Sequence, residues 1–63
     1  MKTYTLKLID ELGNVYYTIE EADYKKMRKI VSTWRKERRN IKIEGEPTVF
    51  KCPNGEELWV YET

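Results

Sequence analysis

The sequence contains no histidine, one cysteine, one serine and three glycines in 63 residues. Without histidine, a zinc site of the usual Cys/His kind is excluded, and neither Ser32 nor Cys52 has the base that would activate it as a nucleophile. Cys52 also lacks a partner for an internal disulfide, so we interpret it as a small, partly buried hydrophobic residue. These absences predict a protein without catalytic residues, metal or cofactor.

Two further elements of enzyme sites are missing. Gly13, Gly45 and Gly55 each stand alone at a turn, so no glycine-rich loop is available to hold a phosphate group. Glu56 and Glu57 are adjacent and would point to opposite faces of a strand, so they cannot work together as general acid and base. We therefore expect a protein that is not an enzyme.

Long apolar runs are also absent. No uninterrupted stretch approaches the roughly 20 apolar residues of a transmembrane helix, and the first residues lead into a strand-like pattern rather than a signal peptide. We expect a cytoplasmic protein. A chain of 63 residues with 40% apolar residues can build one core but not two, so residues 1–63 are expected to form a single domain.

Helical periodicity predicts one long helix, over about residues 20–39. Thr18 and Glu21 have the spacing of a capping box at its start, and Asn40 suits its end because asparagine tolerates the left-handed conformation of a helix cap. The apolar residues at helical spacing form one stripe, which we expect to pack on a sheet: Met27, Ile30, Val31 and Trp34.

Strand patterns surround this helix. Residues 3–9 alternate between apolar and polar, and residues 15–19 are rich in β-branched and aromatic side chains, which predicts an opening hairpin. Three more strands are expected over residues 41–44, 48–52 and 56–61. An Asn-Gly pair between the last two is typical of a two-residue turn. That turn would place Phe50 opposite Trp59 and Val49 opposite Val60, with Phe50 and Trp59 facing the helix.

The order ββαβββ predicts an α+β fold, a small, mainly antiparallel β-sheet with one long amphipathic helix packed on one face. Five strands span roughly 20 Å and a helix is about 10 Å wide, so the helix covers about half of that face. The other face, here called the open sheet face, has no cover. We expect it to carry some of the following apolar residues: Ile9, Tyr16, Val49, Leu58 and Val60.

Charge is distributed unevenly along the chain. The net charge is only +1, but residues 25–39 hold eight bases and one acid, whereas the rest of the chain holds four bases and ten acids. Six of the bases fall opposite or beside the apolar stripe and form what we call the basic helix face: Lys25, Arg28, Lys29, Arg35, Lys36 and Arg39. Such a surface is typical of proteins that bind nucleic acid through its phosphates, although a solvated helix face of an ordinary protein has the same composition.

The aromatic content favours a second hypothesis, a protein-binding regulator or inhibitor that acts through the open sheet face. Tyrosine and tryptophan are enriched at protein interfaces, although a small core also needs their large area. The candidate interface residues are Tyr16, Val49, Val60 and Tyr61. Either function suits a small accessory protein of a bacterium or its phage, which is what we expect from a compact unit rich in lysine, glutamate and tyrosine.

The sequence leaves two alternatives for the assembly state, a homodimer and a monomer. Residues 58–61 of the last strand precede no further element and are expected at an edge of the sheet, where two copies would pair strand to strand or stack their open sheet faces into a homodimer. A strongly twisted sheet covered sufficiently by its helix would instead remain a monomer.

Overall fold

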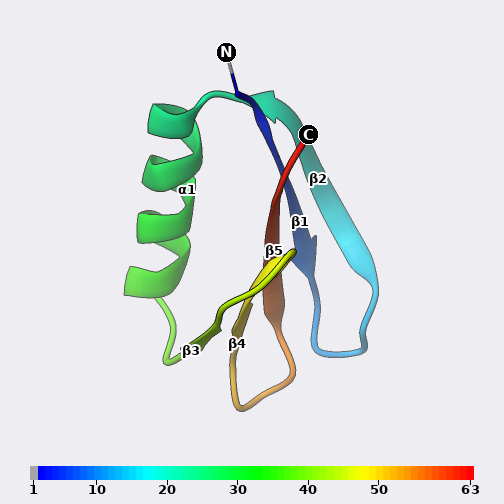
Figure 1. The fold of residues 1–63 in the computed structure, drawn as a ribbon. Coiled ribbons are helices and arrows are strands. Elements are labelled where there is room, and N and C mark those ends of the chain that lie inside the picture. Colours follow the sequence, from blue (N-terminus) through cyan, green and yellow to red (C-terminus); the bar gives the residue numbers. More distant parts are fainter. Residues whose placement is uncertain (1) are drawn as a thin grey trace.

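The computed structural model describes residues 2–63 and contains five strands and one helix. In chain order these elements are β1 (Tyr4–Ile9), β2 (Val15–Ala22), α1 (Tyr24–Lys36), β3 (Ile41–Ile43), β4 (Thr48–Lys51) and β5 (Glu57–Glu62). The strands form one antiparallel sheet in the spatial order β2-β1-β5-β4-β3, with α1 beside one face (Figure 1). The predicted α+β class and element order are confirmed.

The last strand does not lie at an edge, which corrects the expectation from the sequence. β5 pairs with β1 on one side and with β4 on the other, so the edges are β2 and β3. Without each other, β1 and β5 would each have one edge of unpaired backbone groups, and the β1–β5 pairing satisfies these two edges. The two ends of the chain consequently meet, with the Thr63 amide donating to the Thr3 carbonyl at 3.0 Å (Figure 1).

The helix begins later than predicted. Residues 18–21, which have the capping-box spacing, belong to β2 instead, because pairing with β1 extends to Ala22 and buries that side chain completely. An irregularity in the β1–β2 pairing accompanies Glu21, whose φ is 55°. The N-cap is Asp23, whose Oδ1 accepts from the Lys26 amide at 2.8 Å.

The end of the helix also differs. α1 stops at Lys36, and its C-cap is Glu37. Asn40 satisfies the helix end through its side chain rather than through a left-handed backbone, because its Nδ2 donates to the carbonyls of Arg35 (3.1 Å) and Arg38 (2.8 Å). Within residues 2–63, no helix is both long enough and apolar enough to span a bilayer.

The predicted apolar stripe of the helix does pack on the sheet. Trp34 is buried, while Met27, Ile30 and Val31 are partly buried against the core. The core cluster consists of Leu6, Ala22, Trp34, Phe50, Cys52, Leu58 and Val60. Cys52 is therefore a buried hydrophobic residue, as its sequence context indicated, and burial is the main cause that raises the pKa of its thiol.

The β4–β5 hairpin is shifted by one residue from the predicted register. Phe50 pairs with Leu58, and Val49 pairs with Trp59. The cause is a three-residue loop, closed by hydrogen bonds from the Cys52 amide to the Glu56 carbonyl and from the Gly55 amide to the Cys52 carbonyl. A shift of one residue exchanges the faces of a strand. Phe50 thus faces the helix as expected, whereas Trp59 does not.

The same shift decides which residues occupy the open sheet face. Leu58 and Val60 lie in the core on the helix side, so the expectation that they are uncovered is wrong. Val49 and Trp59 point to the opposite face, together with Ile43 of β3, which pairs with Val49.

Candidate nucleic-acid interface

All six residues of the basic helix face are exposed. α1 contains no acidic residue, and within residues 2–63 none of the six side chains forms an ion pair. Five of them lie on α1, while Arg39 follows its end. The positive charge of this surface is therefore not neutralised by neighbouring carboxylates of the protein.

Beside the helix lies an open groove of about 940 Å³, which we call the helix groove. It lies between one flank of α1 and the β5-β4-β3 half of the sheet. Three residues of the basic helix face line its helix wall: Arg28, Arg35 and Lys36. Lys42 of β3 lies across from them, and the floor includes the apolar side chains of Phe50 and Val60.

Arg35 is held in place at this groove. Its guanidinium carbon lies 4.8 Å from the centre of the Phe50 ring, and its Nε donates to Asn40 Oδ1 at 2.8 Å. Within the described chain, its two terminal nitrogens donate to no protein acceptor. Arg35 thus presents free donors from a fixed position, as recognition of a phosphate requires.

Arg28 is arranged similarly at the other end of the helix groove. Its guanidinium carbon lies 5.8 Å from the centre of the Tyr24 ring, and its Nη1 donates to the Tyr24 hydroxyl at 3.4 Å. Tyr24 is 55% exposed, and its ring is tilted against Tyr4 with the centroids 6.1 Å apart. The groove therefore combines cations with an accessible aromatic ring.

Two acidic residues, Glu46 and Glu62, also line the groove. Glu46 Oε1 accepts from the Glu62 amide at 3.2 Å, and the Glu62 carboxylate pairs with Lys2 at 3.4 Å. Lys42 pairs with Glu44 at 3.2 Å, so its charge is partly compensated. Glu46 keeps its negative charge, because a hydrogen bond from a neutral amide does not neutralise a carboxylate. The positive charge of the groove without a carboxylate partner within residues 2–63 is that of its helix wall.

The remaining bases lie away from this groove. Lys25 and Lys29 do not line it, and Lys29 instead borders a smaller depression of about 360 Å³ next to Ile30 and Trp34. The structure thus brings together three of the six predicted residues rather than all six. Sequence reasoning missed Tyr24 and Lys42 as groove residues, since their proximity depends on the strand order.

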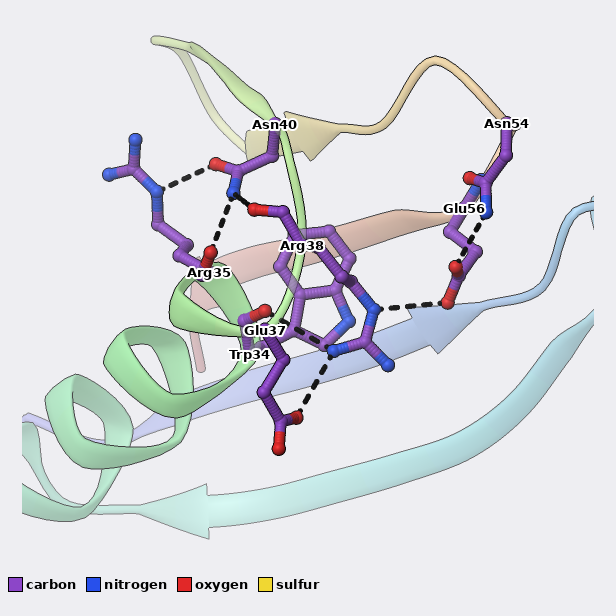
Figure 2. Close-up of polar contacts among 7 residues, drawn as sticks. All are labelled: Trp34, Arg35, Glu37, Arg38, Asn40, Asn54 and Glu56. Atoms are coloured by element: carbon purple, nitrogen blue, oxygen red, sulfur yellow. Dashed lines mark hydrogen bonds and ion pairs between the residues drawn. The ribbon is translucent and has the colours of Figure 1, made fainter.

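Arg38 was counted with the basic segment but has a different role (Figure 2). Its Nε donates to Glu56 Oε2 at 3.1 Å, its Nη1 donates to the Trp34 carbonyl at 3.2 Å, and Nη1 also lies 3.5 Å from Glu37. Glu56 accepts a further bond from Asn54 Nδ2 at 2.8 Å. The hydrogen bonds from Asn54 and then from Arg38 lower the pKa of Glu56. Arg38 thereby connects the end of α1 to the β4–β5 loop through its bonds to Trp34 and Glu56.

The four candidate protein-interface residues are scattered. Val60 is only 8% exposed and lies in the core on the helix side, at the floor of the helix groove, so it is not part of the open sheet face. Tyr16 is half exposed on the edge strand β2, whereas Val49 and Tyr61 are partly buried on β4 and β5. Val49 and Tyr61 lie on the same face of the neighbouring strands β4 and β5, but β1 lies between β5 and the strand that carries Tyr16, so the structure does not gather all four residues into one patch.

No family model matches the chain, and neither a curated protein nor a solved structure matches it. Among residues 2–63, no group of three or more histidine, cysteine, aspartate or glutamate side chains is placed to hold a metal ion. The surface properties described above are therefore the basis of the functional proposal.

Proposed function

We propose that the protein is a small, non-enzymatic accessory protein that binds nucleic acid through the basic helix face. The observation that supports this proposal most strongly is the helix wall of the groove, where Arg28, Arg35 and Lys36 are exposed without a carboxylate partner within residues 2–63. Phosphates neutralise such cations and release bound counterions, which drives association. In this proposal the protein acts in the cytoplasm of a bacterium, or of a bacterium infected by its phage.

The pairing of other cations argues against an ordinary solvated surface. Three lysines outside the helix have carboxylate partners: Lys2 with Glu62, Lys42 with Glu44, and Lys51 with Glu57. If the helix surface served only solubility, glutamate residues placed four positions from its lysines would stabilise the helix by a few tenths of a kcal/mol per pair. α1 has no acid and accepts mild repulsion between like charges instead, for example between Lys25 and Lys29.

Binding of random-sequence DNA and RNA oligonucleotides at 50 mM and 200 mM salt tests the proposal. If about three phosphates are contacted, affinity should fall roughly twentyfold for single strands and roughly fortyfold for a duplex between these concentrations. The variant K29E/K36E/R39E should retain its circular dichroism spectrum and lose binding.

The matched control is K2E/K7E/K51E, which changes the net charge equally but leaves the helix intact. It should lose much less affinity than the helix variant. Equal losses of affinity in the two variants would show that binding depends on net charge alone. Absence of binding at both salt concentrations would refute the proposal.

The alternative function, protein binding through the open sheet face, is favoured by two exposed residues of β3. Ile41 is 65% exposed and Ile43 is 44% exposed, and Ile43 pairs with Val49 on the same face. This function would depend little on salt and would be weakened by V49D or Y16A. Sedimentation at two concentrations identifies a second copy as the partner if the mass rises above that of one chain.

A further inference from the structure

We propose that the helix groove holds a single strand of nucleic acid, with phosphates on its helix wall and bases against its aromatic and apolar surfaces. This inference rests on the proposed function and specifies its substrate class. The groove, rather than the outward crest of the helix, is then the binding site.

The dimensions of the protein favour a single strand over a duplex. The two shorter dimensions of the molecule are 21 and 19 Å, which is about the width of a nucleic-acid duplex. A duplex cannot enter a groove between the helix and the sheet of so small a protein, and would contact only its rim. A single strand is narrow enough to lie along the groove floor.

The chemistry of the groove also fits a strand with accessible bases. Its helix wall carries three cations beside Val31 and the ring of Tyr24, and its floor is apolar, with Phe50 and Val60. A polyanion without rings would leave the half-exposed ring of Tyr24 unused. A single strand presents phosphates together with flat, unpaired bases, and sites for such strands combine a positive groove with aromatic side chains.

Two similar pairs of side chains repeat along the groove. Arg28 lies on Tyr24, and Arg35 lies on Phe50, with distances of 5.8 and 4.8 Å from guanidinium carbon to ring centre. The two arginines are seven residues apart on α1, which is about two turns and roughly 10 Å along the helix axis. A guanidinium held against a ring keeps its outer edge free for a phosphate and has a second flat face for stacking.

The half-exposed ring of Tyr24 is the position where stacking of a base is most accessible. The ring is oriented by Arg28 on one side and by Tyr4 at 6.1 Å. Phe50, by contrast, is buried beneath Arg35 and serves as its support. We therefore assign base stacking to Tyr24, and phosphate binding to Arg28, Arg35 and Lys36.

The experiment measures fluorescence anisotropy with a labelled 12-nucleotide single strand, as DNA and as RNA, and with the DNA duplex of the same sequence. The single strands should bind at least tenfold more tightly than the duplex. Two double variants of α1 remove equal charge: R28Q/R35Q on the groove wall and K25Q/K29Q outside the groove. The first should lose at least tenfold in affinity for the single strand, and the second about twofold to threefold.

A second pair of variants tests stacking without changing charge. Y24L removes the groove ring, and Y17L removes a tyrosine of similar exposure on β2. Loss of one stacked base should weaken binding of the single strand about fivefold or more in Y24L, with no change in Y17L. Circular dichroism and thermal unfolding of all four variants verify that they fold.

The outcomes separate this inference from the proposed function. Equal affinity for strand and duplex, or equal losses in the two double variants, would overturn the groove as the site while nucleic-acid binding stands. An unchanged affinity in Y24L would overturn the stacking role. Absence of binding to any of the three oligonucleotides at 50 mM salt, or binding of poly-glutamate in their place, would refute both proposals.

Discussion

Arg35 and Arg38 lie one helical turn apart in sequence and use the same type of contact for different purposes. Each guanidinium lies against a buried aromatic ring, Arg35 at 4.8 Å from the centre of Phe50 and Arg38 at 4.9 Å from that of Trp34. Figure 2 shows Arg38 directed toward Glu56 and Arg35 directed away from it, toward Asn40. The two arginines differ in whether a carboxylate lies within reach: Arg38 is bound to Glu56, whereas, within residues 2–63, the terminal nitrogens of Arg35 are free to bind a ligand.

The comparison extends to the two regions around these residues. The clamp at the helix end, formed by Trp34, Arg38 and Glu56, satisfies its charges within the protein. The helix groove leaves its wall charges unsatisfied within residues 2–63. Substitutions in the clamp should therefore change stability, and those in the groove should change binding.

The largest effect on stability is expected at Trp34, the ring of the clamp. Truncation to alanine removes a buried aromatic side chain from beneath Arg38 and should lower the free energy of unfolding by about 3–5 kcal/mol. Urea unfolding measures the change, with the exposed neighbour T33A as a control expected within about 0.5 kcal/mol. An unchanged midpoint in W34A would remove Trp34 from the core.

Gly55 should give the next largest effect, because it shapes the loop that carries Glu56. Its φ is 104°, and an added Cβ would lie 2.9 Å from the Glu11 carbonyl oxygen. G55A therefore combines backbone strain with a steric clash and should cost about 2 kcal/mol. Gly13 also has a positive φ of 87° but has open space around it, so G13A should show the backbone cost alone. Equal losses in both variants would mean that the contact with Glu11 is unimportant.

The matched pair R38Q and R35Q tests the comparison directly. R38Q removes the ion pair with Glu56 and the bond to the Trp34 carbonyl, and should lower stability by about 1–2 kcal/mol while nucleic-acid binding is retained. R35Q should change stability by less than about 0.5 kcal/mol and weaken binding. Thermal unfolding and anisotropy of both variants give the answer, and the opposite pattern would contradict the assigned roles.

The smallest expected effect is on the pH dependence of stability. The pKa of Glu56 in the folded protein is lowered from its ordinary value of 4.5 by hydrogen bonds from Asn54 and Arg38. A lowered pKa stabilises the folded state above pH 4.5, and this contribution is lost as the pH falls through the folded value. E56Q should therefore be less stable than the natural protein at pH 7, and the difference should shrink toward pH 3. A difference independent of pH would assign the loss to packing.

The helix stripe and the α+β class were predictable because their signals are local. Met27 and Trp34 belong to a repeat that is visible within three turns of α1. The clamp and the groove were not predictable in this way. Glu56 is 18 residues from Arg38, and its position depends on a three-residue loop in which the sequence indicated two. Lys42 faces Arg35 only because β3 lies at the edge beyond β4.

The helix start was predicted wrongly for a similar reason, because it depends on contacts distant in sequence. Thr18 and Glu21 satisfy the local rule for a helix start, but continued pairing of β2 with β1 buries Ala22 and leaves Asp23 as the only residue between strand and helix. Tertiary contacts outweighed a cap that is worth about 1 kcal/mol.

The central pairing of β1 with β5 has a consequence for folding kinetics. The hydroxyl groups of Thr5 and Thr63 are hydrogen-bonded across 58 positions of the sequence, so the middle of the sheet closes nearly the whole chain. Contacts this distant in sequence slow folding, and we expect the two hairpins to form first and this junction last. In a circular permutant opened between Leu12 and Gly13, β5 and β1 would become a hairpin and the remote pairing would move to the edge. Stopped-flow refolding of that permutant should be faster than that of the natural chain.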